Sequence, residues 1–169
     1  MRITALEEYG LRCLITLAKV GIEGQLPISD IARKEGISVP YVSKVMSRLR
    51  KTGFVNAVRG RTGGFCISRT PDRIILLDVI TALGGPLIDP NYCSRHSGQH
   101  DSCVHIGNCS IQNMLGGLSG IINDTLSSMT LQDMLDNDKV SKRGLGNIHT
   151  LVASATSEQA LSNGNNERI

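Results

Sequence analysis

The sequence predicts a mostly α-helical fold that contains one short β-hairpin and a long C-terminal helix. Three observations support this prediction. Apolar residues recur at helical spacing through most of residues 4–51, two short β-rich runs flank a glycine-rich turn near residue 60, and another helical stripe follows residue 110. With 169 residues, the chain is long enough for one domain and an additional arm.

The first helix is expected from about Thr4 to Lys19. Thr4 followed by Glu7 has the spacing of a capping box, and the apolar residues after it give one largely buried side. Cys13 lies on this side, which favours a small buried residue over a ligand. Glu8 is an acid in the first turn, where the helix dipole favours negative charge.

Two further helices are expected to form a helix-turn-helix unit. Ser29 is the expected cap of a short helix over Asp30–Glu35, which Gly36 ends. Ser38 is expected to cap a third helix that closes at Gly53. The expected buried stripe of this third helix consists of Val42, Val45, Met46 and Leu49. Its outer face is small and basic and contains Pro40, Ser43, Lys44, Ser47, Arg48 and Lys51.

A β-hairpin is expected directly after the third helix. Its two runs are Phe54–Val58 and Phe65–Ser68, and the glycine-rich turn between them carries Arg59 and Arg61. Arginines on such a loop can reach a minor groove or the phosphates of a duplex. We therefore predict a winged helix-turn-helix DNA-binding domain over residues 1–83.

The charge distribution supports a polyanionic partner for the first half of the chain. Residues 1–73 contain 13 Lys or Arg against 6 Asp or Glu, whereas residues 74–169 contain 5 against 9. No apolar run approaches a membrane span, and the N-terminus lacks the layout of a signal peptide, so a cytoplasmic protein without a membrane partner is expected. No catalytic triad, acid pair or cofactor loop indicates an enzyme.

Residues 84–109 are expected to bind a metal centre. The part from Cys93 to Cys109, here called the cysteine segment, holds three cysteines and three histidines and has no helical or strand period. Ligation by Cys93, Cys103 and Cys109 would supply the ordering free energy that a hydrophobic core does not provide here. Spacings of nine and five residues are wide for zinc and suit an iron-sulfur cluster. Zinc stays open, since three histidines could complete its coordination: His96, His100 and His105.

A dimerisation arm is expected over residues 110–135, and a mobile polar tail over residues 136–169. The apolar stripe of the arm runs over about five turns, which is too long for so small a domain to bury alone. A second copy of the chain is the economical partner, and a two-fold dimer also matches a two-fold operator. Thr130 to Leu135 can add one more turn. The stripe consists of Ile111, Met114, Leu115, Leu118, Ile121, Ile122 and Leu126.

Five segments jointly resemble one known family: MRIT, GISVPYVSKVMSRLRKTGFV, VRGRTGGF, LLDVITALGGP and CVHIGNC. Over roughly residues 1–135, the chain resembles the IscR/NsrR/RirA-type family of bacterial iron-sulfur winged-helix transcription regulators. The resemblance implies a homodimer that binds palindromic double-stranded operator DNA. It also implies a sensor of redox state, nitric oxide or iron status that uses an iron-sulfur cluster or, in some members, none.

The resemblance also bears on the fourth cluster ligand. IscR-like members have a histidine three residues after the last cysteine, where this chain has Gln112. Nitric-oxide-sensing members place a carboxylate in the first helix that reaches across the dimer, and Glu8 occupies that position here. The hypothesis is therefore Cys93, Cys103 and Cys109 from one subunit with Glu8 from the other. It favours a 4Fe-4S cluster. A 2Fe-2S cluster and ligation by His100 or His105 remain competing possibilities.

The expected DNA contacts lie on the third helix and the wing, and they are Ser38, Tyr41, Ser43, Lys44, Arg59 and Arg61. Some family members have an acidic residue where Ser43 stands, so their operator preference does not transfer to this chain. Two alternatives to a cluster-dependent regulator remain. One is a cluster-free regulator that uses its cysteines as thiol switches, and the other is an iron-sulfur redox or cluster-transfer protein.

Overall fold

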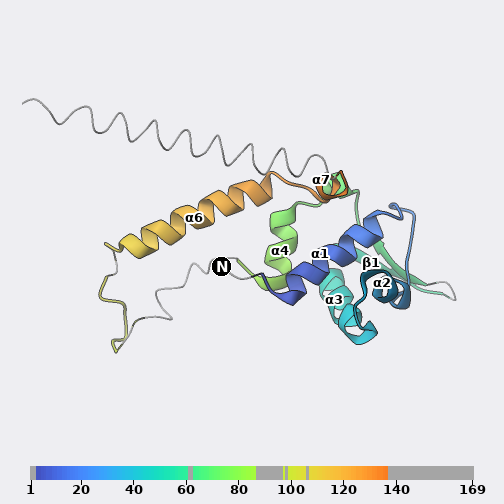
Figure 1. Ribbon diagram of the computed structural model, residues 1–169, viewed down its shortest axis with the longest axis horizontal. Helices are drawn as coiled ribbons and strands as arrows, with labels where there is room; N and C mark the ends of the chain where they lie inside the picture. The colour runs from blue at the N-terminus through green and yellow to red at the C-terminus, as the bar shows by residue number, and fades with distance from the viewer. Residues whose placement is uncertain (1–2, 61–62, 87–96, 98, 106, 137–169) are drawn as a thin grey trace, which may run out of the picture.

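The structure, a computed structural model, describes residues 3–60, 63–86, 97, 99–105 and 107–136. Helices predominate, and the sheet is a two-stranded antiparallel hairpin, which confirms the expected fold class. Figure 1 shows the short helices gathered around α1, with α6 meeting them near α4 and then extending away. Among the described residues, no helix combines the length and apolarity needed to cross a membrane.

Helix α1 (Ala5–Ala18) begins with the predicted capping box. The backbone N–H of Thr4 donates to Glu7 Oε2 at 2.6 Å, and the Thr4 hydroxyl accepts from the Glu7 N–H at 3.4 Å. Both bonds satisfy donors that a helix start otherwise leaves without partners. The central turns are fully inaccessible at Cys13, Leu14 and Leu17, so α1 is the central helix of the core.

Helices α2 (Ile28–Glu35) and α3 (Val39–Lys51) form the predicted helix-turn-helix. The predicted cap of α2 is wrong, because the N-cap is Pro27 and Ser29 lies inside the first turn. The Pro27 carbonyl accepts the N–H groups of Asp30 and Ile31, which starts the helix two residues earlier. Gly36 ends α2 with φ +65°, a conformation that glycine adopts without steric cost.

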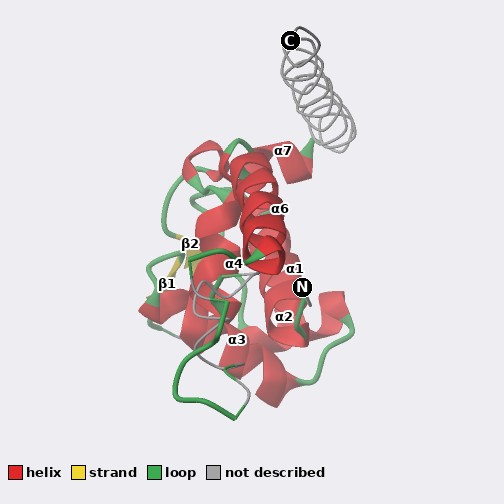
Figure 2. Cartoon of the chain, turned by 90° about the vertical axis from the view of Figure 1, so that its left-hand side faces the viewer, coloured by secondary structure: helices red, strands yellow, loops and turns green. Residues whose placement is uncertain are grey.

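Strands β1 (Val55–Val58) and β2 (Gly64–Ile67) form the wing. In Figure 2 the two strands, drawn in yellow, lie at the edge of the helical group. The chain before α2 also pairs with the wing, because Leu26 and Phe65 exchange two backbone hydrogen bonds of 3.0 and 2.8 Å. This second pairing holds the wing against the segment that leads into the helix-turn-helix.

Helix α4 (Leu76–Gly84) crosses α1 at close range, and two glycines permit the crossing. A Cβ atom at Gly10 would collide with the side chain of Leu83, and a Cβ atom at Gly84 would collide with the carboxyl group of Glu7. The last turn of α4 therefore presses directly on the first two turns of α1.

Helix α6 (Ser110–Ser127) is followed by α7 (Leu131–Leu135), which returns to the winged domain. Two backbone hydrogen bonds fasten this return: the Leu76 N–H donates to Met129 O at 3.0 Å, and the Leu131 N–H donates to Ile74 O at 2.8 Å. Leu131 is fully inaccessible in the same core as α1. Helix α7 also packs on the short 3-10 helix η1 (Pro71–Arg73), so the C-terminal end of α6 is fastened to the winged domain.

The Cys13 thiol should not react with alkylating reagents while the protein is folded. Burial raises its pKa from 9.0 to about 12, with the negative charge of Glu35 as a smaller cause, so the folded thiol stays neutral. At about pH 8, iodoacetamide followed by mass spectrometry should modify Cys66, Cys103 and Cys109 before Cys13. Above pH 9.0 the unfolded thiol loses its proton and the folded one does not, so stability falls as pH rises toward 12. Alkylation of Cys13 at the rate of Cys103 would contradict its burial.

Candidate nucleic-acid interface and cysteine segment

The outer face of α3 is a row of exposed polar and basic side chains. Ser38 is the N-cap residue of α3 as predicted, but its hydroxyl accepts no hydrogen bond from the first turn, all of which the structure describes. Ser43 and Lys44 are also exposed, whereas the predicted buried stripe of this helix is fully inaccessible. The helix therefore presents its polar face outward and leaves the Ser38 hydroxyl available to a ligand.

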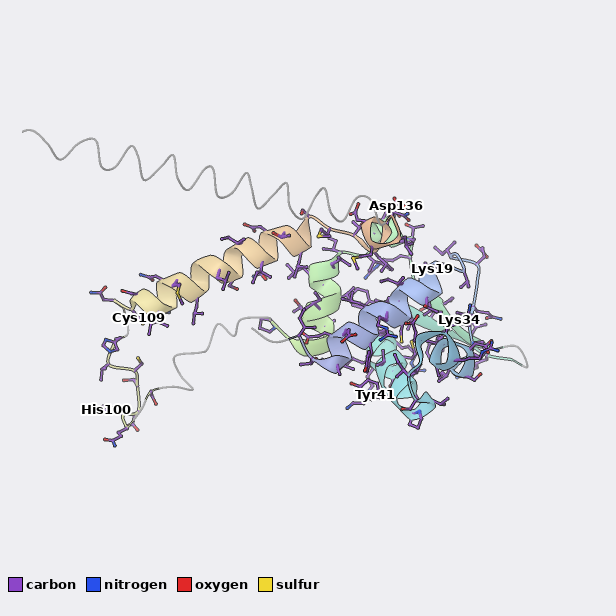
Figure 3. The ribbon with its side chains drawn as sticks, viewed as in Figure 1. Lys19, Lys34, Tyr41, His100, Cys109 and Asp136 are labelled. Carbon is purple, nitrogen blue, oxygen red and sulfur yellow. The ribbon has the colours of Figure 1, made fainter. Side chains whose placement is uncertain are left out.

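Tyr41 is a half-buried support for this face. Its ring packs edge-on against Tyr9 of α1, with ring centroids 5.4 Å apart. The ammonium group of Lys44 lies 5.9 Å from the Tyr41 ring centroid, and the Arg12 guanidinium lies 5.3 Å from that of Tyr9. These contacts hold Lys44 in place through cation–π attraction. Tyr41, marked in Figure 3, thus connects α1 to the outer face of α3.

A cavity of about 500 Å³ lies beside α3, and we call it the basic hollow. Three cationic side chains and one hydroxyl of α3 line it, together with leucines of α1 and α4. Such a set suits an anionic oxygen group such as a phosphate. Of its four α3 residues, only Lys44 is among the expected DNA contacts, although the spacing of i, i+3, i+4 and i+7 puts all four on one helix face. The lining residues are Leu6, Lys44, Ser47, Arg48, Lys51 and Leu83.

An ion-pair network joins the first helix to the end of α2. The Nε–H of Arg12 donates to Glu35 Oε2 at 3.0 Å, its Nη2 contacts the Glu35 carbonyl, and the Thr16 hydroxyl contacts Glu35 Oε1. The hydrogen bond to Glu35 is the main reason that the pKa of Arg12 is raised. Glu8 Oε1 lies 3.7 Å from Arg12 Nη1, and 60% of the Glu8 side chain is exposed. Glu8 is therefore accessible on the surface of α1.

Of the two wing arginines predicted to contact DNA, the structure describes Arg59. Arg59 is exposed at the end of β1, next to Gly60, whose φ of +129° permits the chain to turn. Arg61 lies outside the described residues. Arg59 is therefore an exposed cation at the start of the hairpin turn.

The cysteine segment is described in part. Cys93 and His96 lie outside the described residues, Cys103 is half-buried, and both His100 and His105 are exposed. Within the described residues, no three potential ligands lie together as a metal site would require. Figure 3 shows His100 and Cys109 at the far end of α6, well away from Tyr41 and α1. Within one chain, Cys109 therefore lies far from α1, the helix that carries Glu8.

Cys109 is the N-cap residue of α6, at the junction between the cysteine segment and the helix. Its Sγ accepts a hydrogen bond from the backbone N–H of Gln112 at 3.4 Å. This sulfur lies at the N-terminus of an 18-residue helix, where the helix dipole favours negative charge, so the position suits an anionic ligand atom. The side chain of Gln112 is one turn further along and exposed.

Known proteins share both the sequence and the fold. The Rrf2 family, described as an iron-dependent transcriptional regulator, matches residues 3–137. The HTH-type transcriptional regulators IscR of Photorhabdus laumondii and Xenorhabdus nematophila are 31% and 32% identical over 140 residues, which cover 83% of this chain and 82% of each relative.

Two solved structures are similar over most of their length. IscR of T. potens is 27% identical with a TM-score of 0.64, and the similarity covers 84% of this chain and 91% of that chain. CymR, the global cysteine regulator of B. subtilis, is 26% identical with a TM-score of 0.67, and the similarity covers 81% of this chain and 98% of that chain. These findings confirm the inferred resemblance and the winged-helix fold. The chain therefore belongs to the Rrf2 family of transcriptional regulators.

Proposed function

We propose that this regulator is a homodimer that binds palindromic operator DNA and responds to redox state, nitric oxide or iron status through a bound iron-sulfur cluster. The DNA-binding part is carried by one observation, the exposed basic face of α3 with its basic hollow and the adjacent Arg59. Cations on one helix face and on a wing are the basic surface expected of a protein that binds duplex DNA.

In this proposal, α3 enters the major groove with its N-terminal end. Ser38, Ser43 and Lys44 then face base edges or phosphates, while Tyr41 holds Lys44 in position. Arg59 and Arg61 follow the wing toward the minor groove or the phosphate backbone. The basic hollow receives a phosphate, which adds Ser47 and Lys51 to the expected contacts.

Lys44→Ala and Arg59→Ala should each weaken operator binding by about tenfold, because each removes one cation from the DNA-binding surface of the protein. Each should also reduce, by about one, the slope of log binding constant against log salt concentration. Lys19→Ala is the matched control, since Lys19 is an exposed cation at the other end of α1 (Figure 3). Fluorescence anisotropy at several salt concentrations measures both quantities. An unchanged affinity and slope in both variants would show that DNA docks elsewhere.

The donor chemistry of the cysteine segment fits an iron-sulfur cluster. Soft sulfur ligands are what such clusters use, and the hydrogen bond from the Gln112 N–H to Cys109 Sγ is of the kind that tunes them. When bound, a cluster supplies reversible electron transfer and iron sites open to small ligands. Cys93, Cys103 and Cys109 would hold three irons, and Glu8 of a second subunit would hold the fourth. An oxygen ligand at that position favours a labile 4Fe-4S cluster over 2Fe-2S.

The cofactor is tested by anaerobic purification followed by iron and sulfide analysis. We expect about four irons and four sulfides per chain for a 4Fe-4S cluster and about two of each for 2Fe-2S. Zinc in place of iron would support ligation by histidines of the cysteine segment instead.

A cluster-free thiol switch is the second candidate function. It is supported by the similarity to CymR of B. subtilis at 26% identity, and by the similarity to the oxidized form of Staphylococcus aureus CymR, which is 25% identical with a TM-score of 0.61. In that case Cys103 and Cys109, both half-buried, would respond to oxidants directly. A protein without iron and sulfide whose DNA affinity changes on oxidation would establish this alternative.

A further inference from the structure

The last turn of α4 contains a carbonyl group that the helix cannot satisfy by itself. In a continuing helix, Ala82 O would accept the N–H of residue 86, but that residue is Pro86 and has no N–H. The preceding carbonyl, Thr81 O, accepts the Gly85 N–H at 2.9 Å. Gly85 then leaves the helix with φ +85°. Ala82 O is therefore left for a donor from outside its own helix, either water or another segment of the protein.

That donor comes from the recognition helix. The Nε–H of Arg48 in α3 donates to Ala82 O at 2.8 Å. Arg48 also lines the basic hollow, so the guanidinium group that binds α4 belongs to the surface proposed to face DNA. The Arg48–Ala82 bond is thus a direct link between the end of α4 and the outer face of α3.

The same turn of α4 is connected to the proposed cluster ligands on two sides. Along the chain, Gly85 and Pro86 lead toward Cys93. Across the fold, Leu83 and Gly84 press on Gly10 and Glu7 of α1, and Glu7 is the neighbour of Glu8. Displacement of Glu8 would therefore reach the last turn of α4 through the packed contacts between α1 and α4.

We propose that Arg48 is a positioning residue that couples the cysteine segment to the recognition helix through the Arg48–Ala82 bond. When the end of α4 moves, Ala82 O draws the Arg48 guanidinium with it, which changes the basic hollow and the seating of α3 on DNA. The inference rests on the proposed function, since it assigns a route by which the state of the cysteine segment alters operator affinity.

Two substitutions separate the bond from the charge. In Arg48→Gln, Nε2 stands the same number of bonds from the backbone as the Arg48 Nε, so the donor is kept and the charge is lost. Arg48→Met has a similar length and lacks both donor and charge. Arg50→Ala is the control for charge alone, because Arg50 is an exposed residue of the same helix.

The first readout is amide hydrogen exchange in the last turn of α4, which includes the Gly85 amide. Exchange should be at least about fivefold faster in Arg48→Met than in the wild type, and near the wild-type rate in Arg48→Gln and Arg50→Ala. Equal exchange in Arg48→Met and the wild type would overturn the proposed role of the bond. This readout requires neither DNA nor cluster.

The second readout is the ratio of operator dissociation constants between protein reconstituted anaerobically with iron and sulfide and the cluster-free protein. Coupling between sites of this kind is about 5- to 150-fold. The ratio should persist in Arg48→Gln and fall to within about twofold of one in Arg48→Met, although both lose similar absolute affinity. A wild-type ratio of one would defeat the proposed function. A wild-type ratio well above one that persists in Arg48→Met would defeat the coupling role of Arg48 alone.

Discussion

Leu118→Glu should convert the protein from a dimer to a monomer and reduce operator affinity by about 100-fold or more. Leu118 belongs to an exposed apolar row on α6 with Ile111, Met114 and Ile121, whose side chains are 42–63% accessible. The spacings of three, four and three residues are those of a coiled-coil seam. Burial of one such side chain contributes about 1.5–3 kcal/mol, and a buried carboxylate without a partner costs several more. A glutamate beside its two-fold mate should therefore raise the dimer dissociation constant by about 100- to 10,000-fold.

Asn113→Glu is the matched control for this change, because Asn113 is exposed on α6 and lies off the apolar row. It should leave the dimer intact. Analytical ultracentrifugation at several protein concentrations distinguishes the two species, and circular dichroism verifies that both variants retain their helices. If Leu118→Glu sediments as a dimer, the row on α6 is not the interface of the proposed homodimer.

The split of the α6 stripe was not visible in the sequence. Seven apolar residues at helical spacing predicted one buried face, yet the structure divides them between two directions. Leu115, Ile122 and Leu126 are half-buried, whereas the row that contains Leu118 is exposed, and α6 packs on α4 within the same chain. Periodicity gives the angular width of an apolar face, and which part of that width meets the chain's own core depends on tertiary packing.

Local signals predicted the elements and failed where distant segments meet. The capping box at Thr4 and the left-handed Gly36 are decided by bonds within a few residues, and both were predicted correctly. The pairing of Leu26 with Phe65 joins segments 39 positions apart and was missed. Ser29 is a suitable cap by residue type, but Pro27 takes the N-cap position, since its carbonyl accepts the first N–H groups of the helix.

In the candidate site, too, the features set by local sequence were predictable and those set by contacts between distant segments were not. The outer face of α3 followed from its helical period, so Ser43 and Lys44 were placed correctly on an exposed surface. The Arg48–Ala82 bond depends on how α3 and α4 cross, and the sequence carries no sign of it beyond Pro86. The fourth ligand is a still longer-range question, since it would join two subunits and cannot be read from the packing of one chain.

Mixed dimers should show whether Glu8 acts across the subunit boundary. Cys109→Ala should lose the cluster almost completely, because a thiolate ligand is removed, and Glu8→Ala should retain a cluster with altered absorption and resonance spectra. Gln112→Ala is the control, since Gln112 is exposed beside Cys109 and is not expected to bind iron. It should have the wild-type spectrum.

A heterodimer of Glu8→Ala with Cys109→Ala, isolated through two different affinity tags, contains one site with every ligand intact if Glu8 reaches across. The cysteines of the Glu8→Ala chain then meet the native Glu8 of the other chain, and the opposite site lacks both ligands. The purified heterodimer should therefore show the wild-type spectrum at about half its intensity. If Glu8 instead served its own subunit, the same heterodimer would show the altered Glu8→Ala spectrum at about half intensity. The two arrangements differ in spectral shape at equal iron content, so losses during purification cannot make one resemble the other.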